Sequence, residues 1–304
     1  MGRVIISGGG TGGHIYPAIT IARAIADIEP TEFLYVGSKI GLENTLIPKE
    51  GLPFVTIDVR GLERRISFRN VVTLGKTAGS VFKAERIIHR FKPEVVIGTG
   101  GFVCGPVLLA ASLSGIPTLV QEQNVIPGVT NLILSKFANR VALGYREAAG
   151  RFKKKENLVY TGNPVRKDIL TVSKEEGRSL LGLDPHKFTL LVAGGSRGAR
   201  SINSAMIEVH RYFKDVKDIQ ILHITGDHEY DRVVKQLEGI DGKGRYGEGS
   251  RIIPYLHQMP EALAAADLAV YRAGAVGLAE LTVRGVPSIL IPYPYAAEDH
   301  QRYN

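Results

Sequence analysis

The sequence predicts an α/β protein with two parallel-sheet domains, and three observations support this. The chain has 304 residues, which is beyond the size at which one hydrophobic core stops growing, so two domains are expected. Short β-forming runs alternate with glycine turns and helical patterns, as in parallel strands joined by right-handed crossovers. A glycine-rich turn follows the first strand of each half.

The elements can be placed in order along the chain. In the first half, strands are expected at 4–7, 33–36, 95–98, 118–120 and 141–143, with a helix at 17–28. In the second half, strands are expected at 189–193, 219–225, 251–254, 268–271 and 288–291, with a helix at 276–284. The pattern restarts after Asn163-Pro164, so the expected domains are 1–163 and 164–304. Together they predict two Rossmann-like domains facing a central cleft.

Composition narrows the class of protein. Hydrophobic residues make up 44% and charged residues 22% of the chain, which are ordinary globular values. The single cysteine, Cys104, excludes an internal disulfide framework, fits a reducing compartment and is expected to be a small buried residue. The longest apolar run, around 107–111, is too short to span a bilayer, so neither a membrane span nor a targeting segment is expected.

The net charge of +8 indicates an anionic partner. Residues 60–92 contain nine basic and two acidic residues, interleaved with apolar ones, which favours binding to anionic inner-leaflet lipids. The candidate membrane patch comprises Arg64, Arg65, Ile66, Phe68, Arg69 and Phe82. The alternative is a solvated helix with an ordinary core face. Nucleic-acid binding is disfavoured because few stacking aromatics accompany the cations.

The first glycine loop, Gly8–Gly13, has the spacing of a dinucleotide-binding turn, in which glycines let a phosphate reach a helix N-terminus. A nicotinamide cofactor would also need an acidic residue at the end of the second strand. That strand ends at Ser38, and the next acid, Glu43, lies too far along the chain. A nicotinamide cofactor is therefore disfavoured, and a turn needed only for packing remains an alternative.

His14 lies at the mouth of this loop, next to a helix start expected at Pro17. A histidine there can face the carboxyl ends of the strands, where ligands of open α/β sheets bind. Its unperturbed pKa of about 6.5 would let it accept a hydroxyl proton at neutral pH. A helix-capping or core histidine is the alternative, but the flanking glycines favour function.

Further polar clusters follow other strands. Four glycines lie within Gly98–Gly105, which suggests a close approach of backbone to ligand, or a packing turn. The amides of Gln121–Asn124, expected just past a strand, suit sugar hydroxyls or phosphate, or a solvated loop. In the second half, the helix after Gly274 presents its N-terminus to a diphosphate. Glu280 on that helix can accept both ribose hydroxyls or be a surface acid.

Several chemistries lack their motifs. The sequence has no H-E-x-x-H, paired C-x-x-C or Walker lysine loop, which disfavours zinc hydrolases and P-loop NTPases. A D-x-D pair for a metal-bound nucleotide-sugar is also absent from the sequence. We expect no tightly bound cofactor or metal, and diphosphate charge met by helix termini and cations such as Arg166.

Seven motifs taken in order resemble the MurG family over nearly the whole chain. They are Gly8–His14 with Pro17, Gly98–Pro106, Glu122-Gln123-Asn124, Gly162–Arg166, Gly194–Ala199, Arg272–Gly274 with Glu280, and His300-Gln301. The resemblance implies a GT-B fold and an inverting transferase. The implied reaction moves GlcNAc from UDP-GlcNAc to undecaprenyl-diphospho-MurNAc-pentapeptide (lipid I), giving lipid II for peptidoglycan synthesis at the cytoplasmic face of the bacterial membrane.

The resemblance also implies residue roles, carried over by position. The backbone of Thr11, Gly12 and Gly13, together with Asn124, would face the sugar and acceptor. Arg166 and Ser196 would hold the donor diphosphate, and Ala275, Val276 and Glu280 would line the uridine and ribose. His300 and Gln301 would bind the GlcNAc hydroxyls, and His14 matches the proposed general base of the family.

Two departures from the family pattern keep alternatives open. Gly277 stands where some members have a hydroxyl side chain near the phosphate. The sequence also stops at Asn304, before the helices with which family members usually continue. The alternatives are a UDP-GlcNAc 2-epimerase, a GT-B transferase with another acceptor, and a truncated nucleotide-sugar-binding chain without activity. The acceptor peptide, lipid length and oligomeric state stay open.

Overall fold

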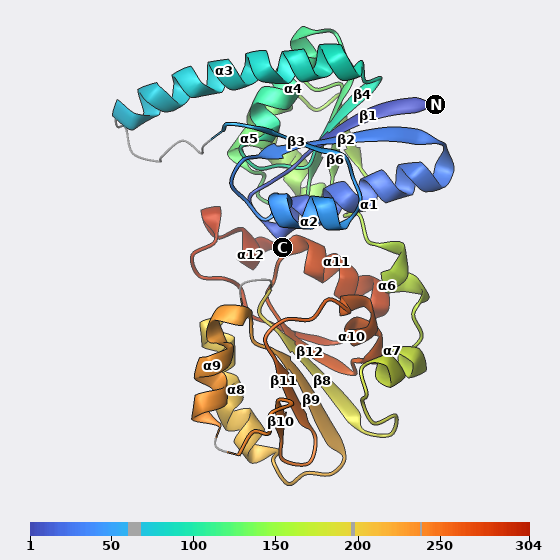
Figure 1. The fold of residues 1–304 in the computed structure, drawn as a ribbon, viewed down its shortest axis with the longest axis vertical. Helices are drawn as coiled ribbons and strands as arrows, with labels where there is room; N and C mark the ends of the chain where they lie inside the picture. The colour runs from blue at the N-terminus through green and yellow to red at the C-terminus, as the bar shows by residue number, and fades with distance from the viewer. Residues whose placement is uncertain (60–67, 196–197, 238) are drawn as a thin grey trace. The chain divides into compact units, whose positions relative to one another are not determined.

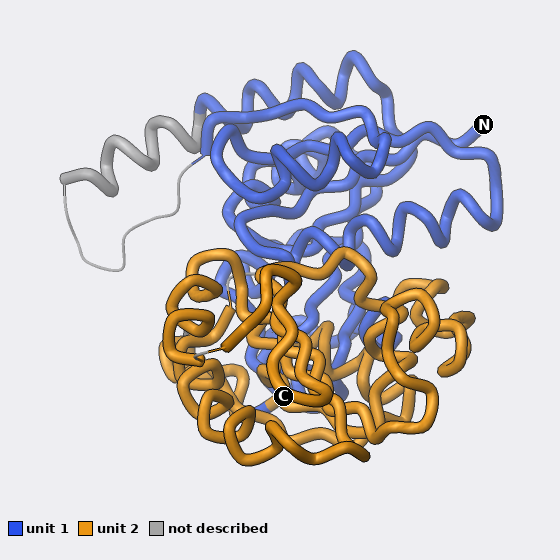
Figure 2. Tube along the Cα trace, turned by 60° about the horizontal axis from the view of Figure 1, so that its bottom comes forward, with its two compact units in different colours: residues 1–164, 303 blue, residues 165–302, 304 orange. Residues whose placement is uncertain are grey.

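A computed structural model describes residues 1–59, 68–195, 198–237 and 239–304, with the side chains of all of these except 68–78 and 297. The chain divides into two compact units, Met1–Pro164 with Tyr303 and Val165–Arg302 with Asn304 (Figure 2). Each unit is an α/β sandwich around one sheet (Figure 1).

The first unit contains a parallel sheet of seven strands in the order β3-β2-β1-β4-β5-β6-β7. Its strands are β1 (Gly2–Ser7), β2 (Thr31–Ser38), β3 (Phe54–Ile57), β4 (Val95–Gly98), β5 (Thr118–Glu122), β6 (Arg140–Leu143) and β7 (Leu158–Tyr160). Its helices are α1 (Gly12–Ile28), α2 (Glu43–Lys49), α3 (Phe68–Phe91), α4 (Cys104–Leu113), α5 (Val129–Leu134) and the 3₁₀ turn η1 (Arg146–Arg151). The strand order reverses between β1 and β4, which is where Rossmann-like sheets bind ligands.

The second unit contains a sheet of six strands in the order β10-β11-β9-β8-β12-β13, parallel except for β10. Its strands are β8 (Phe188–Ala193), β9 (Ile219–Ile224), β10 (Arg245–Tyr246), β11 (Ser250–Ile253), β12 (Leu268–Tyr271) and β13 (Ser288–Leu290). Its helices are α6 (Lys167–Thr171), α7 (Lys174–Leu180), α8 (Arg200–Tyr212), α9 (Asp227–Gln236), α10 (Met259–Ala265), α11 (Ala275–Arg284), η2 (Ala297–Asp299) and α12 (His300–Tyr303). The reversal here lies between β8 and β12.

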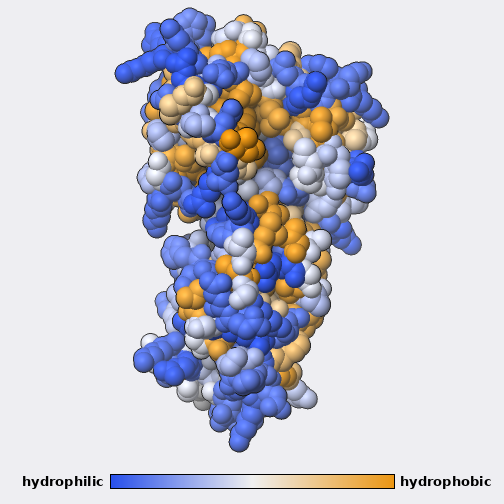
Figure 3. Space-filling model, turned by 90° about the vertical axis from the view of Figure 1, so that its right-hand side faces the viewer, coloured by the Kyte–Doolittle hydropathy of each residue, from blue (hydrophilic) through white to orange (hydrophobic). Residues whose placement is uncertain are grey.

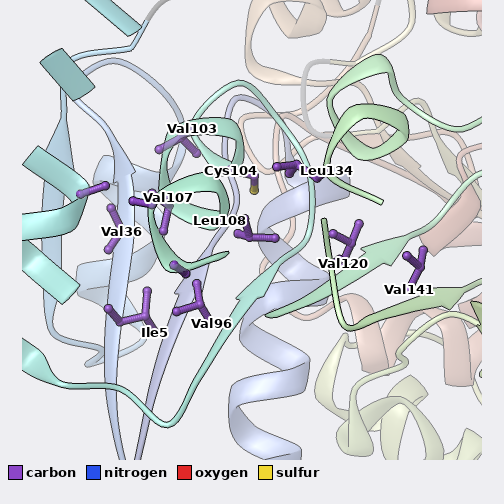
Figure 4. Close-up of a cluster of buried hydrophobic side chains, with 14 of the residues drawn as sticks. Ile5, Val36, Val96, Val103, Cys104, Val107, Leu108, Val120, Leu134 and Val141 are labelled. Atoms are coloured by element: carbon purple, nitrogen blue, oxygen red, sulfur yellow. The ribbon is translucent and has the colours of Figure 1, made fainter. Parts of the chain in front are cut away.

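Alternating side chains of the central strands build a core on each face of both sheets. Ile5 of β1 packs with α3, α4 and α5 in the cluster that Figure 4 shows, whereas Val4 and Ile6 pack with α1 and α2 on the opposite face. In the second unit, Leu191 faces α6, α10 and α11, and Val192 faces α8. Burial on both faces explains why these strands read as continuous apolar runs.

The surface and the helices give two further observations. On the face that Figure 3 shows, hydrophobic residues lie in separate groups among hydrophilic ones. Within the described ranges, no helix is both long enough and apolar enough to cross a membrane.

Candidate functional site

The first glycine loop joins β1 to α1, and buried groups hold its backbone in place. The Tyr35 hydroxyl donates to Gly8 O at 2.8 Å, and Gly9 N–H donates to Gly100 O at 3.2 Å. Gly10 has φ +84, a left-handed conformation that favours glycine, and its N–H donates to a carboxylate oxygen of Glu43 at 3.0 Å. These three hydrogen bonds hold the loop backbone in this conformation.

Helix α1 begins at Gly12, five residues earlier than the sequence predicted, so Pro17 lies inside the helix. Thr11 is its N-cap residue, with an extended backbone at φ −138 and ψ 156. The N–H groups at the start of a helix lack intrahelical acceptors, and the helix dipole makes this end attractive to anions. Thr11, Gly12 and Gly13 thus present backbone donors at the carboxyl edge of the sheet.

His14 is the third residue of α1 and is half-buried. Its Nδ1 lies 3.0 Å from the carbonyl oxygen of Gly9 and 3.5 Å from the Thr11 hydroxyl. Because a carbonyl oxygen can only accept, the Gly9 contact places the proton of the neutral imidazole on Nδ1. Nε2 is then the acceptor nitrogen, which is the form that a general base requires.

The second glycine cluster packs against His14. Gly100 has φ +110, and a Cβ added there would lie 2.7 Å from Cδ2 of His14. The Thr99 hydroxyl donates to His14 O at 2.7 Å. Cys104 is fully buried, as predicted, and its thiol also bonds Ser7 O and Gly100 O at 2.9 Å each. Burial raises the pKa of this thiol to about 11, so at neutral pH Cys104 is a structural donor and not a thiolate.

The Gln121–Asn124 segment differs from the prediction of a ligand-facing or solvated stretch. Gln121 and Glu122 are the last residues of β5, and both are buried together with Gln123. The Glu122 carboxylate accepts from Asn124 N–H at 2.9 Å, Gly128 N–H at 3.0 Å and the Asn131 amide at 2.8 Å. These polar groups serve the loop itself, and Asn124 is the half-buried member of the segment.

In the second unit, the glycine loop after β8 leads into α8. Gly195 and Gly198 have φ +86 and φ +74, and Ala199 is the N-cap residue of α8. The Cβ that Gly198 lacks would lie 2.0 Å from Thr225 O, so this loop passes directly over the end of β9. Ser196, predicted to hold the donor diphosphate, lies outside the described residues.

Helix α11 begins at Ala275 with Gly274 as its N-cap residue, so the predicted helix is present. Arg272, just before it, donates to Ile291 O at 3.2 Å, Pro292 O at 2.9 Å and the Ser201 hydroxyl at 3.0 Å. This arginine therefore ties the start of α11 to α8 and to the loop after β13. Ala275 is buried, and Val276 is half-buried beside it.

Glu280 lies in the second turn of α11 and is largely enclosed. Burial raises the pKa of its carboxyl to about 7, with Arg166 opposing and Asp168 adding to the shift. Arg166 Nε lies 3.2 Å from a carboxylate oxygen of Asp168. The structure thus brings Arg166 and Glu280 together, and it adds Asp168, which the sequence analysis did not single out.

His300 and Gln301 begin α12, near the end of the chain. Gln301 Oε1 accepts from Tyr293 N–H at 2.8 Å, and its Nε2 lies 3.9 Å from the position of a Cβ added to Gly274. Gln301 is therefore adjacent to the N-terminus of α11. His300 precedes it and is half-buried.

Comparison with known proteins identifies the family. Residues 4–143 match the glycosyltransferase family 28 N-terminal domain, and residues 189–304 match its C-terminal domain. The UDP-N-acetylglucosamine--N-acetylmuramyl-(pentapeptide) pyrophosphoryl-undecaprenol N-acetylglucosamine transferase of Halothermothrix orenii is 48% identical over 99% of this chain and 82% of its own length. The chain belongs to the MurG family of glycosyltransferases.

Solved structures agree with this family assignment. The crystal structure of Acinetobacter baumannii MurG has 26% sequence identity and a TM-score of 0.72, covering 99% of this chain and 82% of that one. The UDP-GlcNAc 2-epimerase of Neisseria meningitidis has a TM-score of 0.61 at 12% identity, covering 89% of this chain and 77% of that one, which is a likeness of fold alone. The predicted fold class of two Rossmann-like domains and the predicted family are confirmed.

Some of the MurG-family residues predicted from the sequence lie near one another within their own unit. In the first unit, His14 lies against Gly100, and the Gln123 amide joins the loop of Asn124 to Thr99 O at 2.7 Å. In the second unit, Arg166 interacts electrostatically with Glu280, and Gln301 lies next to Gly274. Gly277 faces the Tyr271 ring, where a Cβ would lie 2.8 Å from Cε1, which gives a steric reason for glycine there.

Part of the predicted membrane patch can be placed. Phe82 is 69% exposed on α3. It borders a surface groove along α3 with Lys83, Arg86 and Arg90. Arg64, Arg65 and Ile66 lie outside the described residues, as do the side chains of Phe68 and Arg69. Other exposed apolar side chains of this unit, among them Leu113, Ile133 and Phe137, were not predicted from the sequence.

Proposed function

We propose that the chain transfers GlcNAc from UDP-GlcNAc to the muramoyl 4-hydroxyl of lipid I, giving lipid II for peptidoglycan synthesis. The single observation that carries this is the 48% identity to a transferase of that name across 99% of the chain. In this proposal the first unit binds the acceptor and the second binds UDP-GlcNAc. The donor is a substrate, and the residues need no tightly bound cofactor for the steps below.

His14 acts as the general base in the proposed reaction. Its Nε2 accepts the proton of the 4-hydroxyl as that oxygen attacks the anomeric carbon from the side opposite UDP. The bond from the anomeric carbon to the diphosphate oxygen breaks, UDP leaves with the electron pair, and a β linkage forms. The Nδ1 contact to Gly9 O, at 3.0 Å, supports this role because it fixes the tautomer.

The donor is held by the second unit in this proposal. The carboxylate of Glu280 accepts the ribose hydroxyls, Ala275 and Val276 line the uridine, and His300 and Gln301 bind the GlcNAc hydroxyls. The N-termini of α8 and α11, with Arg166 and Ser196, meet the diphosphate charge. Such preorganised donors around a leaving group supply much of the stabilisation of a charged transition state. In the first unit, Thr11–Gly13 and Asn124 face the acceptor.

The test uses labelled UDP-GlcNAc with and without a lipid I analogue. Transfer that depends on the analogue supports the proposal, whereas acceptor-independent turnover indicates an epimerase, and binding without turnover indicates an inert chain. Replacing His14 by alanine should lower kcat by about 10²–10⁴-fold while UDP binding is kept. Unchanged turnover of His14→Ala would remove this residue from the mechanism.

We also propose that the chain binds the cytoplasmic face of the bacterial membrane peripherally, through α3 and the basic 60–92 stretch. The exposed Phe82 beside Lys83 and Arg86 supports this, since each cation near an anionic surface contributes about 1 kcal/mol. Sedimentation with anionic liposomes tests it, with Phe82→Ser expected to weaken binding and Tyr212→Ser, an exposed aromatic of the second unit, as the matched control. Binding that is insensitive to salt and to Phe82→Ser would contradict it.

A further inference from the structure

Glu43 is a fully buried carboxylate beneath the first glycine loop. It begins α2, and its side chain fills space that three glycines leave open: a Cβ at Gly9, Gly37 or Gly41 would come within 3.0 Å of it. In the described part of the chain, its hydrogen-bond donors are the neutral groups Gly10 N–H, Ser38 N–H and the Ser38 hydroxyl. A buried carboxylate is costly unless hydrogen bonds satisfy it, and these three donors supply them.

One peptide group joins Glu43 to His14. The carbonyl of Gly9 and the N–H of Gly10 belong to the same amide. The carbonyl accepts from His14 Nδ1 at 3.0 Å, and the N–H donates to Glu43 Oε2 at 3.0 Å. Amide resonance couples these two atoms, so a carboxylate that pulls on the N–H makes the carbonyl oxygen more negative. The Glu43 carboxylate is thus connected to the His14 imidazole through a single peptide group.

We propose that Glu43 is a positioning residue for the transfer reaction, which acts on His14 through the Gly9–Gly10 peptide. Its carboxylate fixes the orientation of this peptide, strengthens the bond from the carbonyl to Nδ1–H, and so increases the proton affinity of Nε2. Carboxylates that orient a histidine directly are common in enzymes, and here an amide lies between the two groups. The proposal rests on the role of His14 as general base.

Two titratable groups that face Glu43 stay neutral near pH 7. Tyr35 of β2 and Cys104 of α4 face it, and burial raises the pKa of both, with repulsion from the Glu43 carboxylate adding to each shift. A substitution that removes the charge of Glu43 therefore changes the protonation of His14 and not that of Tyr35 or Cys104. Shifts in a pH profile near neutrality that Glu43 substitutions cause are then due to the imidazole.

The experiment compares Glu43→Gln, Glu43→Asp and a control in the transferase assay. Glutamine has the same shape, but a neutral oxygen gives weaker bonds than a carboxylate, so kcat should fall about 3- to 10-fold with KM for UDP-GlcNAc unchanged. The acid limb of the kcat/KM profile should move to lower pH, because the imidazole loses proton affinity. Glu43→Asp keeps the charge, so the acid limb of its kcat/KM profile should lie at a pH closer to that of the unmodified chain.

The matched control is Asn44→Ala, in the next residue of α2. The Asn44 amide donates to Ser38 O at 3.0 Å and Gly41 O at 3.2 Å, so its loss loosens the same turn without touching the Gly9–Gly10 peptide. It should lower thermal stability and leave the acid limb in place. An acid limb that moves equally in Asn44→Ala, or that is unmoved in Glu43→Gln, would overturn the proposal.

Nitrogen NMR of the unmodified chain provides a second measurement that needs no variant to fold. In the neutral form, the ¹⁵N shifts of His14 should report a proton on Nδ1, and a proton on Nε2 would overturn the proposal. The general-base role of His14 and the positioning role of Glu43 can be disproved independently. Unchanged turnover in His14→Ala removes the general base itself, whereas a dead His14→Ala beside a fully active Glu43→Gln removes only the role of Glu43.

Discussion

The imidazole of His14 lies directly on the backbone of Gly100, so that a Cβ there would be 2.7 Å from Cδ2 and 3.0 Å from Nε2. We expect Gly100→Ala to displace the imidazole from the Gly9 carbonyl. A misplaced catalytic group commonly costs about 10²-fold in rate, so kcat should fall by that order while UDP-GlcNAc still binds. Steady-state kinetics and donor titration together measure this.

Gly115 provides the control for backbone strain. It has φ +72, also in the left-handed region, but a Cβ there would meet nothing within 4 Å. Gly115→Ala should therefore destabilise the first unit by about 1 kcal/mol from strain alone and leave kcat unchanged. Equal kinetic effects of both substitutions would mean that strain, and not contact with His14, limits turnover.

The central strands and the edge strand β13 could be predicted from the sequence, whereas the edge strands β3, β7 and β10 could not. Each of the ten predicted strands is present within one or two residues, and nine of them are central strands, where burial on both faces produces continuous apolar runs. The missed strands β3, β7 and β10 lie at sheet edges, where partial exposure removes that pattern. The start of α1 also differs from the prediction, because Pro17 lies inside the helix and not in its first turn.

The candidate site was predicted from local glycine spacing, which cannot reveal partners that are distant in sequence. Glu43 lies too far along the chain to be a ribose acid, yet its carboxylate accepts from Gly10 N–H, 33 residues away. The signal available in the sequence was the position of Glu43, an acidic residue that follows closely after Gly41. Conversely, Gln121–Gln123 looked like ligand-facing amides because nothing in the sequence shows that Asn131 and Thr99 bind them.

The pKa of about 7 at Glu280 predicts pH-dependent donor binding. Only the carboxylate can accept both ribose hydroxyls, so affinity for UDP-GlcNAc should rise as pH increases through 7, and binding at pH 7 should release about half a proton. Calorimetry in two buffers of different ionisation enthalpy measures that release.

Two variants check that Glu280 is the group responsible. Glu280→Gln should abolish the pH step and the proton release. Asp168→Asn should shift the step to lower pH, because Asp168 raises the pKa of Glu280. A proton release that survives in Glu280→Gln would assign it to another group.

A buried histidine pair predicts acid sensitivity of the second unit. His210 Nε2 lies 3.0 Å from His223 Nδ1, and His223 Nε2 lies 3.0 Å from the Asn203 amide oxygen. Burial lowers the pKa of His210 to about 4 and that of His223 to about 3. Below pH 6.5 the unfolded chain therefore binds more protons than the folded one, so the free energy of unfolding falls as pH decreases.

Urea unfolding followed between pH 7 and pH 5 measures this loss, which should reach at least about 1 kcal/mol. His223→Gln should reduce the slope with pH even though it lowers stability at pH 7. The control is His186→Gln at an exposed histidine, which should keep the slope. A slope that is the same in all three proteins would exclude the pair as its source.

The two glycines of the second loop allow the contact at the start of α8 to be separated from strain. Gly195 and Gly198 both have positive φ, but a Cβ at Gly195 meets nothing within 4 Å, whereas one at Gly198 would lie 2.0 Å from Thr225 O. Alanine at either position costs about 1 kcal/mol of strain. At Gly198 the backbone must also move away from β9, which shifts the N-terminus of α8.

We therefore expect Gly198→Ala to weaken UDP binding at least about tenfold and Gly195→Ala to change it little, as measured by calorimetry on folded protein. Equal affinities in the two variants would show that the start of α8 does not hold the diphosphate.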